Sequence, residues 1–237
     1  FIYFFCIKFI CKIIIRRKMH NVVKNLVDTQ KKIEFEIRIQ NYKNLPKIIA
    51  VSKTFKIDKI LPLIEHGHLD YGENKVQEAI DKWTEIKKKK PNIQLHMIGG
   101  LQTNKVKFAV KLFDYIHSVD SEKLAKKIAD EQLKIHRKIK IFIQVNIGDE
   151  NQKSGINKNE LSNLVNYCKK LDLNVIGFMC IPPAKTNSEI YFNEMNKLKE
   201  NYNFTELSMG MSSDYLEAAK NNATYLRIGS NIFGQRY

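Results

Sequence analysis

Short runs of apolar residues alternate along the chain with stretches in which apolar residues recur every three or four positions. The short runs are typical of buried strands, and the three-to-four spacing is typical of amphipathic helices. One helical pattern separates each apolar run from the next, and this alternation predicts a parallel sheet, because parallel neighbours need a crossover connection. The predicted strands are IIAVS (48–52), LDYGE (69–73), LHMIG (95–99), YIHSV (115–119), IKIFIQVN (139–146), NVIGFM (174–179), TELSM (205–209) and YLRIG (225–229).

Eight strand–helix units within roughly 200 residues favour one closed (β/α)8 barrel of the TIM type over an open sheet. The helical pattern VVKNLVDTQKKIEFEIRIQN (22–41) precedes the first strand and predicts an extra N-terminal helix. A doubly wound open sheet is the alternative, but no GxGxxG motif follows the first strand. No Pro/Gly-rich linker interrupts the pattern, so we expect residues 19–237 to form one α/β domain.

The first 18 residues, FIYFFCIKFICKIIIRRK, differ from the rest of the chain. Lys8 and Lys12 interrupt the apolar run, which is shorter than the about 20 residues of a membrane-spanning helix. A secretory signal would begin with positive charges and end in small residues, and this segment does neither. Residues 1–18 are therefore interpreted as an apolar leader, and an upstream extension and a targeting or anchoring segment both stay open.

The composition describes a basic globular protein of 237 residues with a formal net charge of +15. Many of the lysines lie along helical patterns, as in EIKKKK and KLAKKIADEQLK, where they are typical of a solvated face. No RNA-binding or zinc-finger signature accompanies the charge, so we expect no nucleic-acid partner. The four cysteines form no CxxC pair, which implies neither a zinc site nor a redox motif, and a reducing compartment fits them best.

Lys53 stands where the first predicted strand ends, in IIAVSKTFK (48–56). It is either a solvated charge at a strand exit or an amine at the mouth of a pocket, where desolvation makes it a nucleophile. In a (β/α)8 barrel, functional residues come from the carboxyl ends of the strands and the loops that follow. Polar residues and glycines follow most of the other predicted strands as well, and this favours the second interpretation.

Two Gly- and Ser-rich stretches, SMGMSSD (208–214) and RIGSNIFG (227–234), follow the last two strands. Backbone N–H groups in such turns bind phosphate, although Gly and Ser are also common in ordinary turns. The first and eighth strands become neighbours when the barrel closes, so Lys53 would face these stretches. An amine opposite a phosphate site suits a phosphorylated aldehyde bound as a Schiff base, and pyridoxal phosphate is the obvious candidate.

Three further residues at strand ends each allow two interpretations. Arg227 is either a salt-bridged surface residue or a partner that keeps a pyridine nitrogen unprotonated, because Arg does not give up its proton. His96 either stacks on a cofactor ring or fills the rim, and filling the rim is the favoured interpretation. Asn74 either donates a hydrogen bond to the phenolic oxygen of the cofactor or caps the next helix.

Eight motifs follow one another along the chain, namely AVSKTF, YGENKVQE, HMIGGLQTNK, HSVDS, QVNIGDENQKSG, GFMCIPP, LSMGMSSDYLEAA and RIGSNIFGQR. In this order and spacing they resemble the YggS/PROSC family of pyridoxal phosphate homeostasis proteins. The resemblance covers about residues 20–237, and two departures from the family pattern are Gly100, where Pro is common, and Cys180, where a small residue is common.

The resemblance implies a barrel similar to the N-terminal domain of alanine racemase, with the cofactor pyridoxal 5'-phosphate carried as an internal aldimine on Lys53. It also implies that Asn74 lies beside the cofactor and that Arg227 faces the ring nitrogen. The phosphate contacts that it implies are Ser212, Gly229 and Ser230.

The resemblance implies a protein that holds, buffers or delivers pyridoxal phosphate without strong catalysis. Alanine racemase pairs its lysine with a tyrosine base from a second domain, and because few residues follow position 229 we expect this chain to lack that domain. An amino-acid racemase-like enzyme is the alternative. A Schiff-base aldolase would need a carboxylate or tyrosine relay that the sequence does not place.

The expected partners are pyridoxal phosphate and, for delivery, pyridoxal phosphate-dependent apo-enzymes. We expect a monomer with no membrane contact by the barrel. The expected location is the cytoplasm, or a mitochondrion or other organelle if residues 1–18 are a targeting segment.

Overall fold

The computed structural model describes residues 19–39, 45–150, 154–184 and 186–235. The expectations for residues 1–18 therefore lie outside the described residues.

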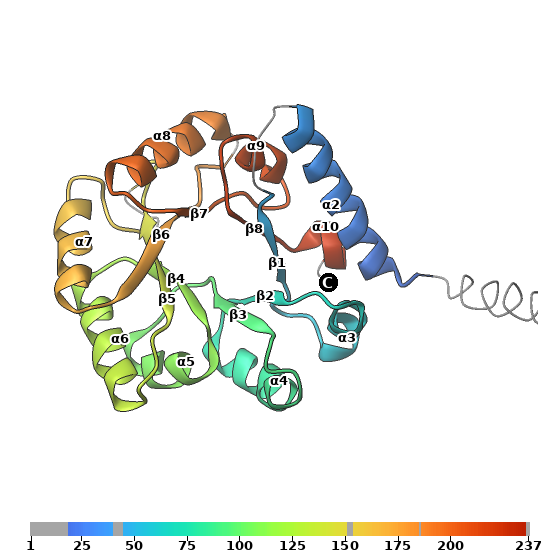
Figure 1. Ribbon diagram of the computed structural model, residues 1–237, viewed down its shortest axis with the longest axis horizontal. Helices are drawn as coiled ribbons and strands as arrows, with labels where there is room; N and C mark the ends of the chain where they lie inside the picture. Colours follow the sequence, from blue (N-terminus) through green and yellow to red (C-terminus); the bar gives the residue numbers. More distant parts are fainter. Residues whose placement is uncertain (1–18, 40–44, 151–153, 185, 236–237) are drawn as a thin grey trace, which may run out of the picture.

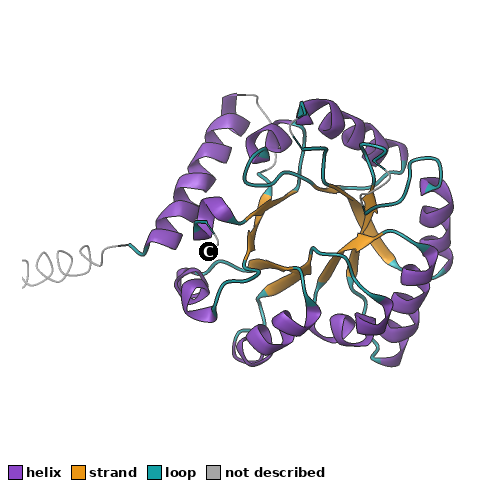
Figure 2. Cartoon of the chain, turned by 180° about the vertical axis from the view of Figure 1, so that it is seen from behind, coloured by secondary structure: helices purple, strands orange, loops and turns teal. Residues whose placement is uncertain are grey.

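Eight parallel strands form a closed barrel in which each strand pairs with its neighbours in sequence, and β1 pairs with β8. Figure 2 shows this ring of strands in orange, enclosed by helices. The predicted (β/α)8 barrel is confirmed. The strands are β1 (Lys47–Val51), β2 (Asp70–Glu73), β3 (Gln94–Met97), β4 (Tyr115–Val119), β5 (Lys140–Val145), β6 (Asn174–Cys180), β7 (Glu206–Ser208) and β8 (Tyr225–Ile228).

Helices cover the outside of the barrel, and each helix between two strands is the crossover that their parallel pairing requires (Figure 1). No helix within the described ranges is both long and apolar enough to cross a membrane. The helical elements are α2 (Asn21–Ile39), α3 (Ile57–His66), α4 (Val76–Lys89), η1 (Thr103–Lys105), α5 (Val106–Leu112), α6 (Glu122–Lys134), α7 (Leu161–Lys170), α8 (Ser188–Asn201), α9 (Tyr215–Lys220) and α10 (Ser230–Phe233).

The alternation of side chains along each strand separates an outer core from an inner one. On β8, Leu226 and Ile228 belong to the large apolar cluster between strands and helices. Tyr225 belongs to a second, smaller cluster, and Arg227 shares its face of the strand. The members of this inner cluster are Ile49, Tyr115, Phe142, Met179 and Tyr225. The barrel interior thus holds the buried polar side chain of Arg227 in addition to this inner cluster.

The predicted N-terminal helix is α2, which packs against α3, α9 and α10 beside the junction of β1 and β8 (Figure 1). Its apolar face is buried, and Leu26 and Ile33 are 1% and 2% exposed. The amide Nδ2 of Asn25 donates a hydrogen bond of 3.0 Å to the carbonyl oxygen of Ile232 in α10. The first described helix thus holds the segment that directly follows β8.

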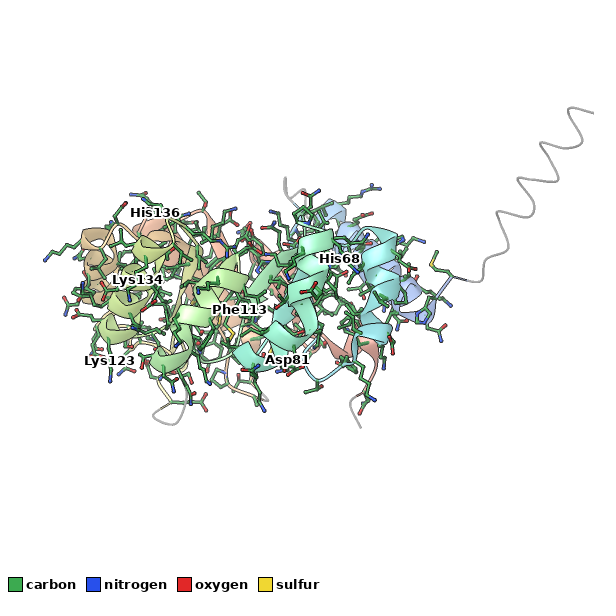
Figure 3. The ribbon with its side chains drawn as sticks, turned by 90° about the horizontal axis from the view of Figure 1, so that it is seen from below. His68, Asp81, Phe113, Lys123, Lys134 and His136 are labelled. Atoms are coloured by element: carbon green, nitrogen blue, oxygen red, sulfur yellow. The ribbon has the colours of Figure 1, made fainter. Side chains whose placement is uncertain are left out.

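The two ends of the barrel can be followed in the side view of Figure 3. Lys123, near the start of α6, and His136, just after its end, lie at the bottom and at the top of this view, toward opposite ends of the barrel. His68, which precedes β2, lies toward the end marked by His136. The carboxyl ends of the strands, where a barrel of this type carries its functional residues, therefore lie toward the end marked by Lys123.

Candidate functional site

A pocket of about 720 Å³ opens at the carboxyl ends of the strands. This volume lies within the range of small-molecule binding sites. All six residues predicted to bind the cofactor line it, namely Lys53, Asn74, Ser212, Arg227, Gly229 and Ser230. The other lining residues were not among the predicted cofactor contacts, and these are Val51, Ile98, Ile181, Met211, Ser213, Asn231 and Gln235.

The two cationic side chains of the pocket are Lys53 and Arg227, and no Asp or Glu occurs among the lining residues that the structure describes. Lys53 comes from the loop after β1, and Arg227 comes from β8, the strand that pairs with β1. Since opposite charges attract in a partly buried site, this pocket suits an anionic ligand.

The loop that carries Lys53 has a strained backbone held by a hydrogen bond. Thr54, the next residue, has φ of 69°, which is unfavourable for a β-branched residue. Its N–H donates a hydrogen bond of 2.5 Å to Glu78 Oε1 in α4. Strained residues cost on the order of 1–3 kcal/mol and persist where the surroundings determine them, often at functional sites.

A buried ion pair fixes the start of the same loop. Glu73 is fully buried, and its Oε1 accepts hydrogen bonds from Lys82 Nζ at 2.8 Å, Ser52 Oγ at 2.7 Å and Trp83 Nε1 at 3.0 Å. Lys82 also donates to the carbonyl oxygen of Ser52 at 2.9 Å. Because Ser52 precedes Lys53, this cluster determines where the Lys53 backbone leaves the barrel.

Arg227 is buried, with 4% exposure, and its described hydrogen bonds all go to oxygen acceptors. Its Nη1 donates to the carbonyl oxygen of Ser208 at 2.6 Å and to Ser208 Oγ at 2.8 Å, and its Nη2 donates to the carbonyl oxygen of Cys180 at 2.8 Å. Burial lowers the pKa of Arg227, but a guanidinium stays protonated at neutral pH. The interpretation of Arg227 as a surface residue is therefore wrong.

The turn after β7 requires glycine at position 210. Gly210 has φ of 86°, in the left-handed region, and a Cβ there would lie 2.5 Å from Ala218 Cβ in α9. Its carbonyl oxygen accepts a hydrogen bond of 2.9 Å from the Arg227 N–H. The backbone of the β7 turn is thus joined to the strand that carries the pocket guanidinium.

The turns after β7 and β8 are tied together through Ser212. Its Oγ accepts a hydrogen bond of 3.3 Å from the Gly229 N–H, and its carbonyl oxygen accepts one of 3.2 Å from Asn231 Nδ2. Ser212 and Ser230 therefore line the same pocket from two adjacent turns. Serine hydroxyls and turn N–H groups are suitable donors to a phosphate.

Asn74 does not cap the helix that follows it. The residue before α4 is Lys75, and no side-chain hydrogen bond caps this helix. Asn74 Oδ1 is buried and has no hydrogen-bond partner among the described residues. A buried polar atom without a partner costs free energy, so this oxygen at the pocket wall has the capacity to accept a hydrogen bond that the described residues do not supply.

Gly99 lets the chain approach Asn74 closely. A Cβ at Gly99 would lie 2.6 Å from the Asn74 carbonyl oxygen and 2.9 Å from its Cα. At Gly100, the next residue, a Cβ would meet nothing within 4 Å. Gly99 therefore fixes the position of Asn74 at the pocket wall.

We expect Gly99→Ala to displace Asn74 and to weaken ligand binding at the pocket, with a loss of about 1–3 kcal/mol in the free energy of unfolding, typical of overpacking. The matched control Gly100→Ala should leave both quantities nearly unchanged. Urea denaturation and a ligand titration of the two variants check this expectation. Equal behaviour of the two variants would contradict it.

His96 does not fill the rim as expected. It is fully buried inside the barrel, below the pocket, and does not line it. Its ring stacks on Tyr115 with a centroid distance of 4.2 Å. Its nitrogens contact Asp70 and His117, at 3.0 and 2.9 Å.

Comparison with known proteins identifies relatives over most of the chain. Residues 36–237 match the family described as alanine racemase, N-terminal domain. The pyridoxal phosphate homeostasis protein of Haemophilus influenzae is 35% identical over 228 residues, which cover 91% of this chain and 96% of that protein. The protein of the same description from Escherichia coli K12 is 32% identical over 229 residues, with 92% and 98% covered.

Solved structures agree with the sequence relatives. PipY of Synechococcus elongatus PCC7942 with PLP bound has a TM-score of 0.73 and 32% identity, covering 85% of this chain and 100% of that one. Alanine racemase of Clostridium difficile 630 shares the fold alone, with a TM-score of 0.69 at 13% identity, covering 91% of this chain and 57% of that one. The chain belongs to the family of pyridoxal phosphate homeostasis proteins, built on the barrel of the alanine racemase N-terminal domain.

Proposed function

We propose that this protein binds pyridoxal 5'-phosphate in the pocket, with the Lys53 amine joined to its aldehyde as a Schiff base, and that it acts in pyridoxal phosphate homeostasis by holding and delivering the cofactor. One observation carries the proposal: an amine, a guanidinium and two serine-containing turns converge on a single pocket. The relatives named as pyridoxal phosphate homeostasis proteins and PipY with PLP bound support it.

The residues of the pocket fit the groups of this cofactor. Ser212 and Ser230 offer hydroxyl donors for the phosphate, beside Gly229. Asn74 offers its Nδ2 amide as a hydrogen-bond donor to the phenolic oxygen, while its Oδ1, without a partner among the described residues, can accept from a different donor. The cationic pocket suits a phosphate ester, because it brings Lys53 and Arg227 together without a lining carboxylate.

Arg227 is proposed to face the pyridine nitrogen. When bound, pyridoxal phosphate stabilises carbanions as an electron sink, most strongly with a protonated ring nitrogen. A guanidinium can only donate hydrogen bonds. It therefore provides no acceptor that would stabilise a proton on the pyridine nitrogen. Three oxygen atoms accept hydrogen bonds from the Arg227 guanidinium. These hydrogen bonds fix the position of the guanidinium and stabilise its protonated form.

The pocket is better suited to a carrier than to a racemase. A two-base racemisation needs a second acid/base on the face opposite the lysine. Among the lining residues that the structure describes, Lys53 and Arg227 are the titratable side chains, and no Tyr, His, Cys, Asp or Glu joins them. Delivery of the cofactor to pyridoxal phosphate-dependent apo-enzymes is the proposed outcome of binding.

We expect the purified protein to take up pyridoxal phosphate with a visible absorbance band, but to exchange the α-hydrogen of alanine or serine no faster than free pyridoxal phosphate at the same concentration. Absorbance titration measures the first property, and proton NMR in deuterated buffer measures the second. Rapid exchange by the protein would replace the carrier assignment with a racemase-like enzyme. Absence of the band would refute cofactor binding itself.

A further inference from the structure

Five polar side chains form one continuous hydrogen-bonded series inside the barrel. Arg227 Nη1 lies 2.8 Å from Ser208 Oγ, which lies 2.8 Å from His117 Nδ1. His117 Nε2 lies 2.9 Å from His96 Nδ1, and His96 Nε2 lies 3.0 Å from Asp70 Oδ1. We refer to Asp70, His96, His117 and Ser208 as the core series.

The core series crosses the interior from one end of the barrel to the other. Asp70 is the first residue of β2 and lies with His68 in a pocket of about 240 Å³ at the amino ends of the strands. Figure 3 labels His68 toward this end. Arg227 lines the large pocket at the opposite end. His96, His117 and Ser208 between them have no exposed surface.

The two ends of the series determine which atom donates at each step. Arg227 can only donate, and an ionised Asp70 can only accept. Although burial opposes its ionisation, the hydrogen bond from His96 keeps the pKa of Asp70 below its ordinary value. Burial lowers the pKa of both His96 and His117, so each ring is neutral at neutral pH.

Neutral rings leave one consistent arrangement. His96 donates its Nε2–H to Asp70, so its Nδ1 must accept from His117 Nε2–H. His117 Nδ1 then accepts from the Ser208 hydroxyl, whose oxygen accepts from Arg227. Every hydrogen bond therefore points in the same direction, from the guanidinium to the carboxylate.

The aligned hydrogen bonds offset the cost of burying the charge of Arg227. Burying a charge is costly unless it is paired and hydrogen-bonded. Within the part of the chain that the structure describes, no carboxylate forms an ion pair with Arg227. Aligned hydrogen bonds polarise one another, so the negative charge of Asp70 strengthens each acceptor along the series. Ser208 becomes a better acceptor for the guanidinium as a result.

We propose that the core series is a positioning unit for Arg227. The series holds the guanidinium in one orientation toward the ligand pocket, and it extends to Asp70 at the opposite end of the barrel. The inference rests on the proposed function, because it assigns to Arg227 a role toward bound pyridoxal phosphate. Ser208, His117, His96 and Asp70 act through Arg227 and do not line its pocket.

The test breaks the series at His117, away from the pocket. Its ring stacks on Phe142 with a centroid distance of 4.3 Å, so His117→Phe keeps an aromatic ring there and removes both nitrogens. We expect this variant to bind pyridoxal phosphate roughly tenfold more weakly, as after loss of a hydrogen bond to a charged group, and with a shifted absorbance maximum. His117→Gln, which carries one acceptor and one donor, should restore most of both properties.

Two further measurements separate positioning from stability. The outer-core variant Ile141→Val should lower the melting temperature without moving the absorbance maximum, because Ile141 is buried outside the series. In the native protein without cofactor, nitrogen NMR of the imidazoles should show His96 and His117 as neutral Nε2–H tautomers. An Nδ1–H tautomer or a charged ring at either residue would overturn the proposal even if His117→Phe fails to fold.

The outcomes distinguish this inference from the proposed function. If the native protein binds the cofactor and His117→Phe has the same affinity and spectrum, the positioning role is wrong and the binding assignment stands. If the native protein shows no band with pyridoxal phosphate, the proposed function fails and the positioning role fails with it. A shifted spectrum in His117→Phe, with recovery in His117→Gln, supports both.

Discussion

Lys53→Ala should lose the visible absorbance band that pyridoxal phosphate gives with the native protein. The variant removes the amine that the Schiff base requires, while the loop keeps its anchors, because these lie on the Ser52 and Thr54 backbones. Since Lys53 lies at the pocket mouth and outside the packed cores, the melting temperature should change little. The matched control is Lys56→Ala, an exposed lysine three residues further along the same loop.

Borohydride reduction makes this prediction sharper. Reduction of the Schiff base fixes the cofactor to its lysine, and peptide mapping then identifies the modified residue. The native protein and Lys56→Ala should both carry the label on the peptide that contains Lys53. A full band in Lys53→Ala, or a label on another lysine of the native protein, would show that Lys53 has been misassigned.

Lys82→Met should destabilise the protein by about 3–5 kcal/mol, because it leaves the carboxylate of Glu73 buried without its cation. Glu73 has no exposed surface, and the Lys82 side chain is only 8% exposed. Lys82 also bonds to the carbonyl oxygen of Ser52, so cofactor affinity should fall as the Lys53 loop loosens. Urea denaturation measures the first effect, and absorbance titration measures the second.

Lys88→Met provides the matched control on the same helix. Lys88 pairs with Glu85 at 2.6 Å, but the two side chains are 67% and 72% exposed, and solvent screens such surface pairs so that they contribute little to stability. The double variant Glu73→Gln with Lys82→Met should recover part of the lost stability, since no unpaired charge is then buried. Comparable losses in Lys82→Met and Lys88→Met would mean that the buried pair does not hold the loop.

The barrel could be predicted from sequence because its evidence is local. Each strand is a short apolar run separated from the next strand by a helical pattern, and eight such units in this length favour a closed parallel sheet, which the structure has. Closure brings β1 beside β8, and this juxtaposition follows from topology alone. The convergence of Lys53 with Ser212 and Arg227 on one pocket could therefore be anticipated, although Lys53 precedes them by 159 and 174 positions.

The interior of the site could not be predicted, because its partners are set by register and side-chain direction. His96 and His117 lie on adjacent strands whose pairing places His96 opposite Tyr115, which brings the two imidazoles together. Ser208 reaches His117 across 91 positions from a strand of three residues. The sequence around a single histidine in a strand does not indicate such partners. It is equally compatible with a histidine that only fills space at the barrel rim.

The hydrogen-bond acceptors around Arg227 could not be predicted from the sequence either. Two of its partners are the backbone carbonyl oxygens of Ser208 and Cys180, and the identity of a side chain does not predict a backbone acceptor. A carboxylate at position 227 would face these oxygens and be repelled. Substitutions that keep a donor, such as Arg227→Lys, are therefore better probes of this residue.

The hydrogen bond between Asn25 and Ile232 has a consequence for biosynthesis, because it joins residues 207 positions apart. While β8 has not yet left the ribosome, the nascent sheet has two exposed edges, β1 and β7. The turn that contains Gly229 and Ser230 is then also missing. Contacts between distant positions form late, after the entropy of closing a long loop has been overcome. The pocket is thus completed only after residues 225–232 have been synthesised, so a chain truncated before β8 lacks Arg227, Gly229 and Ser230 of its lining.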